Sequence, residues 1–243
     1  TNHMTDNGYY SFNRDFIRFE VDTLRGSSKV RMRMIVSEYV TSTDKSRHPH
    51  QKYRIGDVNF SYDRSSGSPI WFRKSLLNSA SRLVSGDIFR ESNVSETYAR
   101  INRLGAVAAT NVRMEPNQQD SSLLDANIVI TPSRLNSVSL GLDGTNTAGD
   151  LGAAASFTYQ NRNVFHGSEI FSLKARMAFE AIRGLKGYAD QNYFEYGIEA
   201  DLLFPDFIFP FVSKDFKSKS RANSELSVAY ASQDRPEFHR RVL

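Results

Sequence analysis

The sequence predicts an α+β fold in which a β-α-α-β-β domain is followed by antiparallel strands of a membrane β-barrel wall. Residues 138–232 contain four or five stretches in which apolar and polar side chains alternate, as they do in a strand with one apolar and one polar face. Residues 53–132 combine strand patterns with two amphipathic helical patterns. No apolar run approaches the ~20 residues of a membrane-crossing helix, so membrane contact would have to come from strands or from a surface.

The first 50 residues predict a pair of strands joined by a turn. Every second residue is apolar in 17–21 and again in 30–36, where Arg31 and Arg33 occupy the opposite face. The polar segment that follows, TSTDKSRHPHQ (41–51), has the composition of a link between domains. The next 80 residues also end in two strands, so we interpret residues 1–50 as the end of a truncated copy of the same unit.

Residues 51–132 predict one complete unit with the order β-α-α-β-β. Its strands are expected at 53–62, 108–114 and 124–130, with Pro132 ending the last one. Between the first two strands, residues 71–84 have helical periodicity, and a second helix is expected to begin at Asn93.

The two predicted helices have apolar faces that should cover one side of a single sheet. Asn93 is a suitable N-cap, because Glu96 stands at the third helical position that completes a capping box. The residues expected to be buried beneath the helices are Leu76, Leu83, Tyr98 and Ile101.

The clearest alternation lies in residues 171–180, FSLKARMAFE, and in 194–202, FEYGIEADL. An apolar and a charged face suit a barrel wall between lipid and a polar lumen, but they also suit one sheet of an antiparallel sandwich. If the connection is centred near Lys186, Lys174 lies opposite Glu199. We therefore expect a charge network on the polar face, made of Lys174, Arg176, Glu195 and Glu199. The opposite face should hold Phe171, Leu173, Met177, Phe179, Phe194, Tyr196 and Ile198.

Composition and motifs predict neither an enzyme nor a cofactor-binding protein. The chain has 243 residues, a net charge of +4 and no cysteine. His48 and His50 flank Pro49 without a nearby acidic or sulfur partner, so no metal site is expected. Nucleophile elbows, phosphate loops and dinucleotide fingerprints are absent from the sequence. The basic stretch around 214–221 is interrupted by Asp215 and serines, which favours a solvated turn over nucleic-acid binding.

Four segments, in this order and spacing, resemble the BamA/TamA-type outer-membrane assembly family, also called bacterial surface antigens, which combines polypeptide-transport-associated (POTRA) domains with a β-barrel. They are YRIGDVNFSYD (53–63), SGDIFRESNVSETYARINRLGAV (85–107), LDANIVITPS (124–133) and TYQNRNVFHGSE (158–169). The segments YYSFNRDFIRFEVDT (9–23) and FPDFIFPF (204–211) are similar to the forms found in Bacteroidetes members. The resemblance spans nearly the whole chain.

This resemblance implies three domains. Residues 1–50 would be the C-terminal part of one POTRA domain, 51–132 a complete POTRA domain, and 133–243 the first strands of an outer-membrane barrel. Family barrels have sixteen strands whereas this chain supplies about five, so we expect a fragment with an incomplete barrel. The family's localisation is the Gram-negative outer membrane, with the POTRA domains in the periplasm.

The resemblance also implies where function lies. A POTRA sheet would leave residues 108–114 as an open edge, and the first barrel strand would offer a second edge at 136–144. Unfolded outer-membrane proteins are the expected clients, alongside outer-membrane lipid and periplasmic or lipoprotein accessory subunits, and no nucleic acid. Two alternatives stay open, a two-partner-type secretion porin and a soluble β-rich interaction module. The residues expected to pair with client strands are Ala108, Ala109, Thr110, Asn111, Val112, Arg113, Met114, Asn136, Val138, Leu140 and Leu142.

Overall fold

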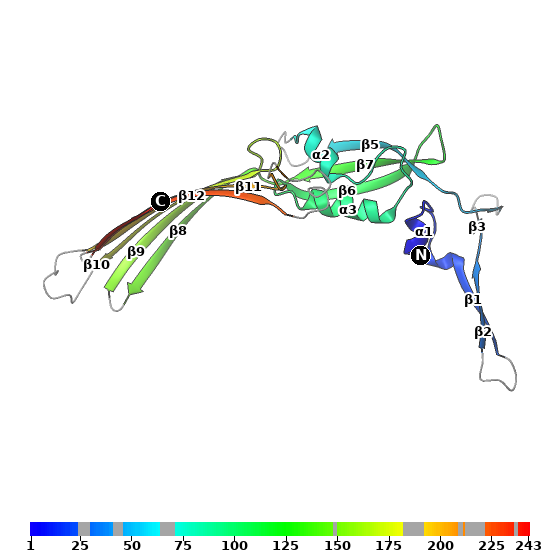
Figure 1. Cartoon of the computed structure of the whole chain (residues 1–243), viewed down its shortest axis with the longest axis horizontal. Helices are drawn as coiled ribbons and strands as arrows, with labels where there is room; N and C mark the ends of the chain where they lie inside the picture. Colours follow the sequence, from blue (N-terminus) through cyan, green and yellow to red (C-terminus); the bar gives the residue numbers. More distant parts are fainter. Residues whose placement is uncertain are drawn as a thin grey trace. The chain divides into compact units, whose positions relative to one another are not determined.

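The computed structural model describes residues 1–23, 30–40, 46–63, 71–147, 150–181, 192–208, 211, 222–235 and 238–243. The chain divides into two compact units. The first comprises Thr1–Asp63, Ala80–Ile101 and Thr110–Ile130, and the second comprises Arg64–Ser79, Asn102–Ala109 and Thr131–Leu243 (Figure 1). The expected connection near Lys186 and the basic stretch 214–221 lie outside the described residues, and the predicted domain limits at 50 and 132 stay predictions.

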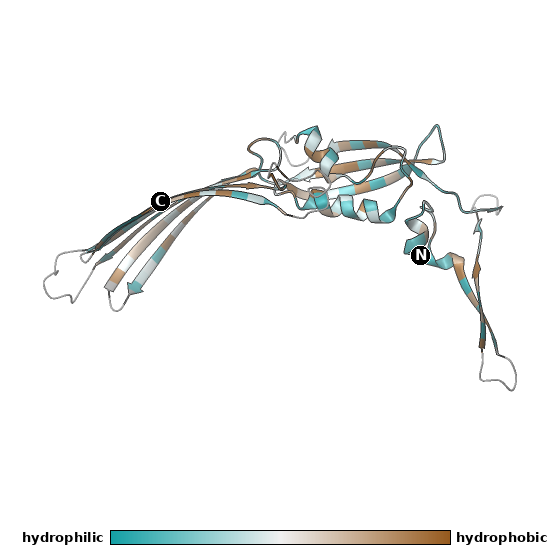
Figure 2. Ribbon diagram, in the orientation of Figure 1, coloured by the Kyte–Doolittle hydropathy of each residue, from teal (hydrophilic) through white to brown (hydrophobic). Residues whose placement is uncertain are grey.

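A three-stranded sheet is formed by β5 (Arg54–Tyr62), β6 (Val107–Pro116) and β7 (Leu123–Pro132). Its order is β5-β7-β6, with β5 and β7 parallel, so β7 lies in the centre. Figure 2 shows bands of hydrophobic and hydrophilic colour along these strands. In β7 every second side chain is buried, from Leu124 to Pro132, which confirms the alternation predicted for this strand.

Two helices, α2 (Lys74–Ala80) and α3 (Glu91–Asn102), stand between β5 and β6 in the chain, as predicted. The expectation of a helix over 71–84 is wrong in length. Serine side chains replace helical hydrogen bonds at its end, because Ser79 Oγ donates to the Leu76 carbonyl (2.8 Å) and Ser81 Oγ accepts from the Leu83 N–H (3.0 Å). Since α2 falls almost wholly in the second unit, a common sheet face for both helices stays a prediction.

Helix α3 begins two residues earlier than predicted, so Asn93 is not its N-cap. The N–H of Ser92, in its first turn, donates to Asp6 Oδ1 at 2.9 Å, and this carboxylate lies 86 residues away in the sequence. Tyr98 was expected to be buried but is 50% exposed. Thr97 takes the inner position four residues before Ile101, with its hydroxyl donating to the Asn93 carbonyl (2.7 Å) and accepting from the Arg82 N–H (2.8 Å).

The N-terminal residues form short elements around a two-stranded ribbon. Strands β1 (Ile17–Thr23) and β2 (Val30–Val36) pair antiparallel as predicted, with Phe19 opposite Met34 and Val21 opposite Met32. The shared apolar face is exposed. The remaining elements are α1 (Asn2–Thr5), the 3₁₀ turn η1 (Arg14–Phe16), β3 (Tyr39–Val40) and β4 (Arg47–His48), the last two forming a small pair at the predicted polar link.

The second unit contains a six-stranded antiparallel sheet with the order β13-β12-β11-β10-β9-β8. One strand more than expected is present, because residues 238–242 also pair. None of the described helices is long and apolar enough to cross a membrane. The strands are β8 (Asn136–Thr147), β9 (Asp150–Asn161), β10 (Ile170–Ala181), β11 (Tyr193–Phe204), β12 (Ser224–Arg235) and β13 (Phe238–Val242).

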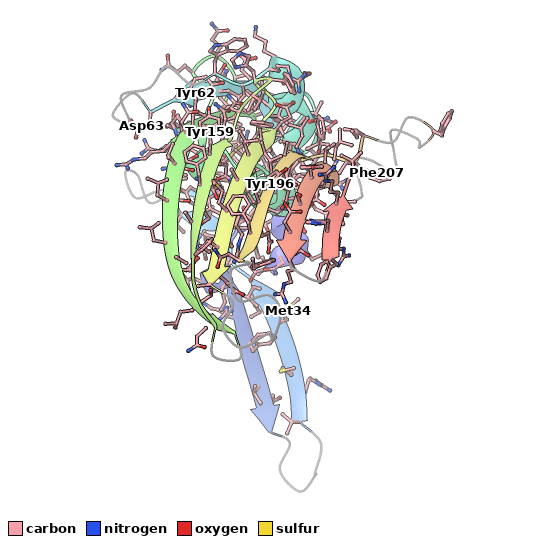
Figure 3. All side chains as sticks on the ribbon, turned by 90° about the vertical axis from the view of Figure 1, so that its left-hand side faces the viewer. Met34, Tyr62, Asp63, Tyr159, Tyr196 and Phe207 are labelled. Carbon is pink, nitrogen blue, oxygen red and sulfur yellow. The ribbon has the colours of Figure 1, made fainter. Side chains whose placement is uncertain are left out.

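The register places the apolar positions of neighbouring strands on one face. Met177 lies opposite Tyr196 and Ala155, and Phe179 lies opposite Phe194. Figure 3 shows Tyr159 of β9 and Tyr196 of β11 on the same face of the sheet. Lys174, Arg176, Glu195 and Glu199 have the opposite parity, so the predicted separation of the two sets between the faces is confirmed.

Candidate functional site

Strand β6 is an edge of the three-stranded sheet, as expected, because β7 is paired on both sides and β6 on one. Within 108–114, Thr110 is buried and Val112 and Met114 are half-buried, whereas Ala108, Ala109, Asn111 and Arg113 are exposed. One side of the strand therefore faces the protein interior, while the backbone edge has no neighbouring strand among the described residues.

The outward direction of the β6 backbone follows from two hydrogen bonds. Asn117 lies just beyond the strand, and its N–H donates to the Leu123 carbonyl at 2.9 Å. The backbone groups of this odd-numbered residue therefore point toward β7. The Met114 carbonyl instead accepts from the Tyr10 hydroxyl at 3.2 Å. Because backbone groups of successive strand residues point to opposite sides, Thr110 and Val112 also direct their N–H and C=O groups away from β7.

Strand β8 is one of the two edges of the six-stranded sheet, again as expected. Its apolar side chains are exposed, with Leu140 78% and Leu142 86% exposed. Near the middle of the strand, the polar face carries the small residues Ser139 and Gly141 and then Asp143. The centre of β8 is thus held by its backbone ladder to β9.

Side chains hold both ends of β8. Asn136 Oδ1 accepts from the Tyr159 hydroxyl (2.9 Å) and from Asn161 Nδ2 (2.7 Å). At the far end, Thr145 Oγ1 donates to Glu180 Oε1 of β10 at 3.1 Å, across Gly152 of the intervening strand. A Cβ at Gly152 would collide with both side chains, so glycine is required for this bridge.

The predicted charge network is present in part. Lys174 Nζ lies 3.0 Å from Glu199 Oε1 and 3.0 Å from Asp201 Oδ2, and Asp201 also accepts from the Ser227 hydroxyl at 2.5 Å. The predicted pairing of Lys174 with Glu199 across the two strands is confirmed. The network therefore joins β10, β11 and β12 on the polar face.

Two predicted members do not join this network. Arg176 lies opposite Gly197 and Ser156, neither of which is charged, and it forms no ion pair with a described residue. Glu195 instead accepts from the hydroxyl of Tyr193, whose ring lies beneath the Arg235 guanidinium at 4.5 Å. The prediction for Arg176 is wrong because alternation predicts on which face a side chain lies, but not which residue of the neighbouring strand lies opposite it.

A buried cluster that was missed from the sequence surrounds the turn between β9 and β10. Glu169 is 3% exposed, and its carboxylate accepts from Arg73 Nη2 (2.6 Å) and from the backbone N–H groups of Gly167 (2.8 Å) and Phe165 (3.3 Å). The ring of His166 stacks on Trp71 at 3.8 Å. These contacts bind the segment before α2 to the turn between β9 and β10, the second and third strands of the six-stranded sheet.

The loop after α3 also forms a hydrogen bond to the turn between β9 and β10. Ser168 has a φ of 58°, and its hydroxyl accepts from the Ala106 N–H at 3.0 Å. Asn163 closes the turn by accepting from the Ser168 N–H at 2.9 Å. A glycine-containing turn with asparagine, serine and glutamate was the available sequence signal, but only the fold brings Arg73 and Ala106 to it.

The paired histidines of the polar link have hydrogen-bond partners. His48 Nε2 lies 2.5 Å from Ser46 Oγ, and His50 Nε2 lies 2.8 Å from the Ser37 carbonyl oxygen. Within the described ranges no three His, Asp or Glu side chains gather as a metal site would require. Both histidines border a hollow of about 490 Å³ whose other lining residues are Tyr9, Ser11, Phe12, Tyr39, Pro49, Gln51 and Tyr53.

On the surface of the first unit, Glu96 contacts two arginines. Its carboxylate contacts Arg100 Nε (2.9 Å) and Arg82 Nε (3.3 Å). Partial burial acts to raise the pKa of Glu96, but the two arginines outweigh it and lower that pKa below its ordinary value of 4.5. Asp120 also has a lowered pKa, because it accepts from the Ser122 hydroxyl and N–H.

No protein-family model and no curated protein matches the chain. Among solved structures, the chain is similar to BamA from Haemophilus ducreyi lacking POTRA domains 1–3, with a TM-score of 0.51 and 15% identity over 95% of this chain and 42% of that one. It is also similar to CdiB from Acinetobacter baumannii, with a TM-score of 0.45 and 12% identity over 77% of this chain and 39% of that one. The chain spans less than half the length of either structure.

The likeness to BamA concerns the fold. The six-stranded antiparallel sheet corresponds to barrel strands of a BamA-type fold, so that part of the predicted fold class is confirmed. At 15% identity, clients, partners and site residues cannot be carried over from the solved structure.

Proposed function

We propose that this chain is part of an outer-membrane assembly factor that receives unfolded barrel proteins by strand pairing at β6 and β8. The observation that carries the proposal is the edge of β6, where Thr110 and Val112 direct backbone groups outward and no strand among the described residues lies beside them. An extended client can hydrogen-bond to such an edge whatever its side chains are. That suits a receptor whose many clients share alternation but little sequence.

In this proposal residues 133–243 are the first strands of a sixteen-stranded barrel in a Gram-negative outer membrane. The exposed apolar face, which includes Val138, Leu140 and Leu142, contacts lipid, and the face with Lys174 and Asp201 lines the lumen. Residues 51–132 form a POTRA domain in the periplasm and 1–50 the end of another, as in Bacteroidetes-like members. The protein works without catalysis or a cofactor, with periplasmic or lipoprotein subunits as further partners.

The experiment measures binding of a barrel-strand peptide to the full chain in detergent micelles. The probe is a fluorescent peptide with the sequence of β10, IFSLKARMAFEA, and its control is a scrambled peptide without alternation. Val112→Pro removes an outward N–H and places the proline ring on the open edge, while the restriction on Asn111 favours the extended conformation that it already has. We expect a folded protein with at least ~5-fold weaker binding, since several edge hydrogen bonds are lost together.

Two control variants separate binding from folding. Val112→Ala keeps the backbone donor and should bind like the unchanged chain. Arg113→Pro removes a donor that points toward β7, so it should unfold the three-stranded sheet as judged by circular dichroism. If Val112→Pro stays folded and binds as well as Val112→Ala, strand addition at β6 is wrong. Binding that is confined to one exported protein, with no affinity for barrel strands, would support the secretion-porin alternative instead.

A further inference from the structure

The open edge of β6 ends at a side chain from the N-terminal segment, Tyr10. The Tyr10 hydroxyl donates to the outward carbonyl of Met114 at 3.2 Å. We infer that Tyr10 is a stop that limits how far a client strand can pair along β6, an inference that rests on the proposed function. A client can pair with Thr110 and Val112, but its next pair would need the backbone groups of Met114.

Tyr10 is held in this position by aromatic packing. Its ring makes edge contacts with Phe89 (centroids 5.2 Å apart) and with Tyr53 (6.0 Å apart). Such edge-to-face pairs fix both the place and the tilt of a ring. The hydroxyl therefore reaches β6 from a ring that is already oriented, not from a freely rotating side chain.

The backbone on either side of Tyr10 is also bound to the first unit. The Tyr53 N–H donates to the Gly8 carbonyl at 2.8 Å, and Gly8 has a φ of +97°, a conformation that favours glycine. Asp6 accepts from the Ser92 N–H at 2.9 Å, and Phe12 is buried. Residues 6–12 thus form a fixed segment that ends the edge, although the Tyr10 side chain itself is 37% exposed.

A stop at Tyr10 predicts that the binding affinity of a client strand depends on the length of that strand. A short strand that pairs only with Thr110 and Val112 does not meet Tyr10. A longer strand has to compete with the phenol for the Met114 carbonyl. Removing the hydroxyl while keeping the ring should therefore strengthen binding of long strands on the order of 2- to 10-fold, the effect of one hydrogen bond, and leave short strands unchanged.

The test compares Tyr10→Phe with Tyr9→Phe in the full chain in detergent micelles. Tyr9 is the neighbouring phenol, but its ring lies beneath Lys52 Nζ at 5.3 Å, so it serves as the matched control. The probes are the twelve-residue β10 peptide and a five-residue peptide from its centre, LKARM. Tyr10→Phe should tighten binding of the longer peptide only, and Tyr9→Phe should change neither affinity.

The outcomes distinguish the stop from the proposed function. If Val112→Pro weakens binding but Tyr10→Phe leaves the long peptide's affinity unchanged or lower, the stop is wrong and pairing at β6 stands. Equal tightening of both peptides also overturns the stop, because a length limit acts on the longer one alone. If Val112→Pro has no effect, pairing at β6 and the stop fail together.

Discussion

Two adjacent residues of β12 provide a sharp test of which face meets lipid. Val228 lies on the apolar face, opposite Ala200, and Ala229 lies on the polar face, opposite Glu199. Both side chains are exposed in the sheet. Arginine can therefore be introduced at either position without a collision inside the protein, and any difference in cost comes from the surroundings of the two faces.

The expected costs differ because lipid and a polar lumen solvate arginine differently. On the lipid face near the bilayer midplane, an arginine destabilises a barrel by about 2–4 kcal/mol. On the polar face, Ala229→Arg places a cation opposite Glu199, and an exposed pair of that kind changes stability by no more than about 1 kcal/mol. In water, both are surface substitutions and should stay within about 0.5 kcal/mol.

The assay is urea unfolding of the full chain in phospholipid vesicles and in lipid-free buffer, followed by far-ultraviolet circular dichroism. We expect Val228→Arg to be more destabilising than Ala229→Arg in vesicles and the difference to vanish without lipid. Equal costs in vesicles would refute the assignment of the faces. A large cost of Val228→Arg in lipid-free buffer, in a freely soluble protein, would instead support the sandwich alternative.

Two further predictions concern the ion pairs. Glu169→Ala should cost at least ~2 kcal/mol in the free energy of unfolding, because it leaves the buried Gly167 N–H without its acceptor, whereas Glu96→Ala at the exposed pair should cost about 1 kcal/mol or less. Thermal unfolding of both variants compares them, and equal costs would contradict the buried role of Glu169. Because the pKa of Glu96 is lowered on folding, its contribution is present above pH 4.5 and is lost as the pH falls below that value. Glu96→Gln should therefore differ in urea midpoint from the unchanged chain at pH 6, and this difference should shrink as the pH is lowered below 4.5; a difference that stays constant over this range would contradict the assignment.

The strands could be predicted from the sequence because alternation is a local signal. In β10 and β11, alternation predicted which side chains lie on each face of the sheet. A connection centred near Lys186 also predicted that Lys174 pairs with Glu199. The same reasoning could not say that Arg176 stands opposite Gly197, since the hairpin register decides which side chains meet. Residues 238–242 were not expected as a strand, because their sequence, FHRRV, lacks regular alternation.

Helix boundaries and the tightest polar contacts depended on residues far away in the chain. Asn93 is a residue type that favours the N-cap position, but the helix begins before it. In the first turn the acceptor comes from Asp6, whose Oδ1 accepts from the Ser92 N–H. Thr97 is fully buried because its hydroxyl is satisfied on both sides, which no hydropathy pattern can express. For the same reason, the binding of Glu169 to Arg73 was out of reach of the sequence.

The centres of the two open edges carry few of the features by which proteins usually protect sheet edges. Exposed edge strands are normally blocked by lysines, prolines or bulges, because they otherwise pair with other chains. Strand β8 contains no lysine, arginine or proline and one aspartate, and its side-chain contacts lie near its ends, at Asn136 and Thr145. Strand β6 has its proline at the last position, Pro116, beyond the site where Tyr10 contacts Met114. In both strands the ends are secured and the centre is left unprotected, an arrangement suited to pairing with a strand of another chain.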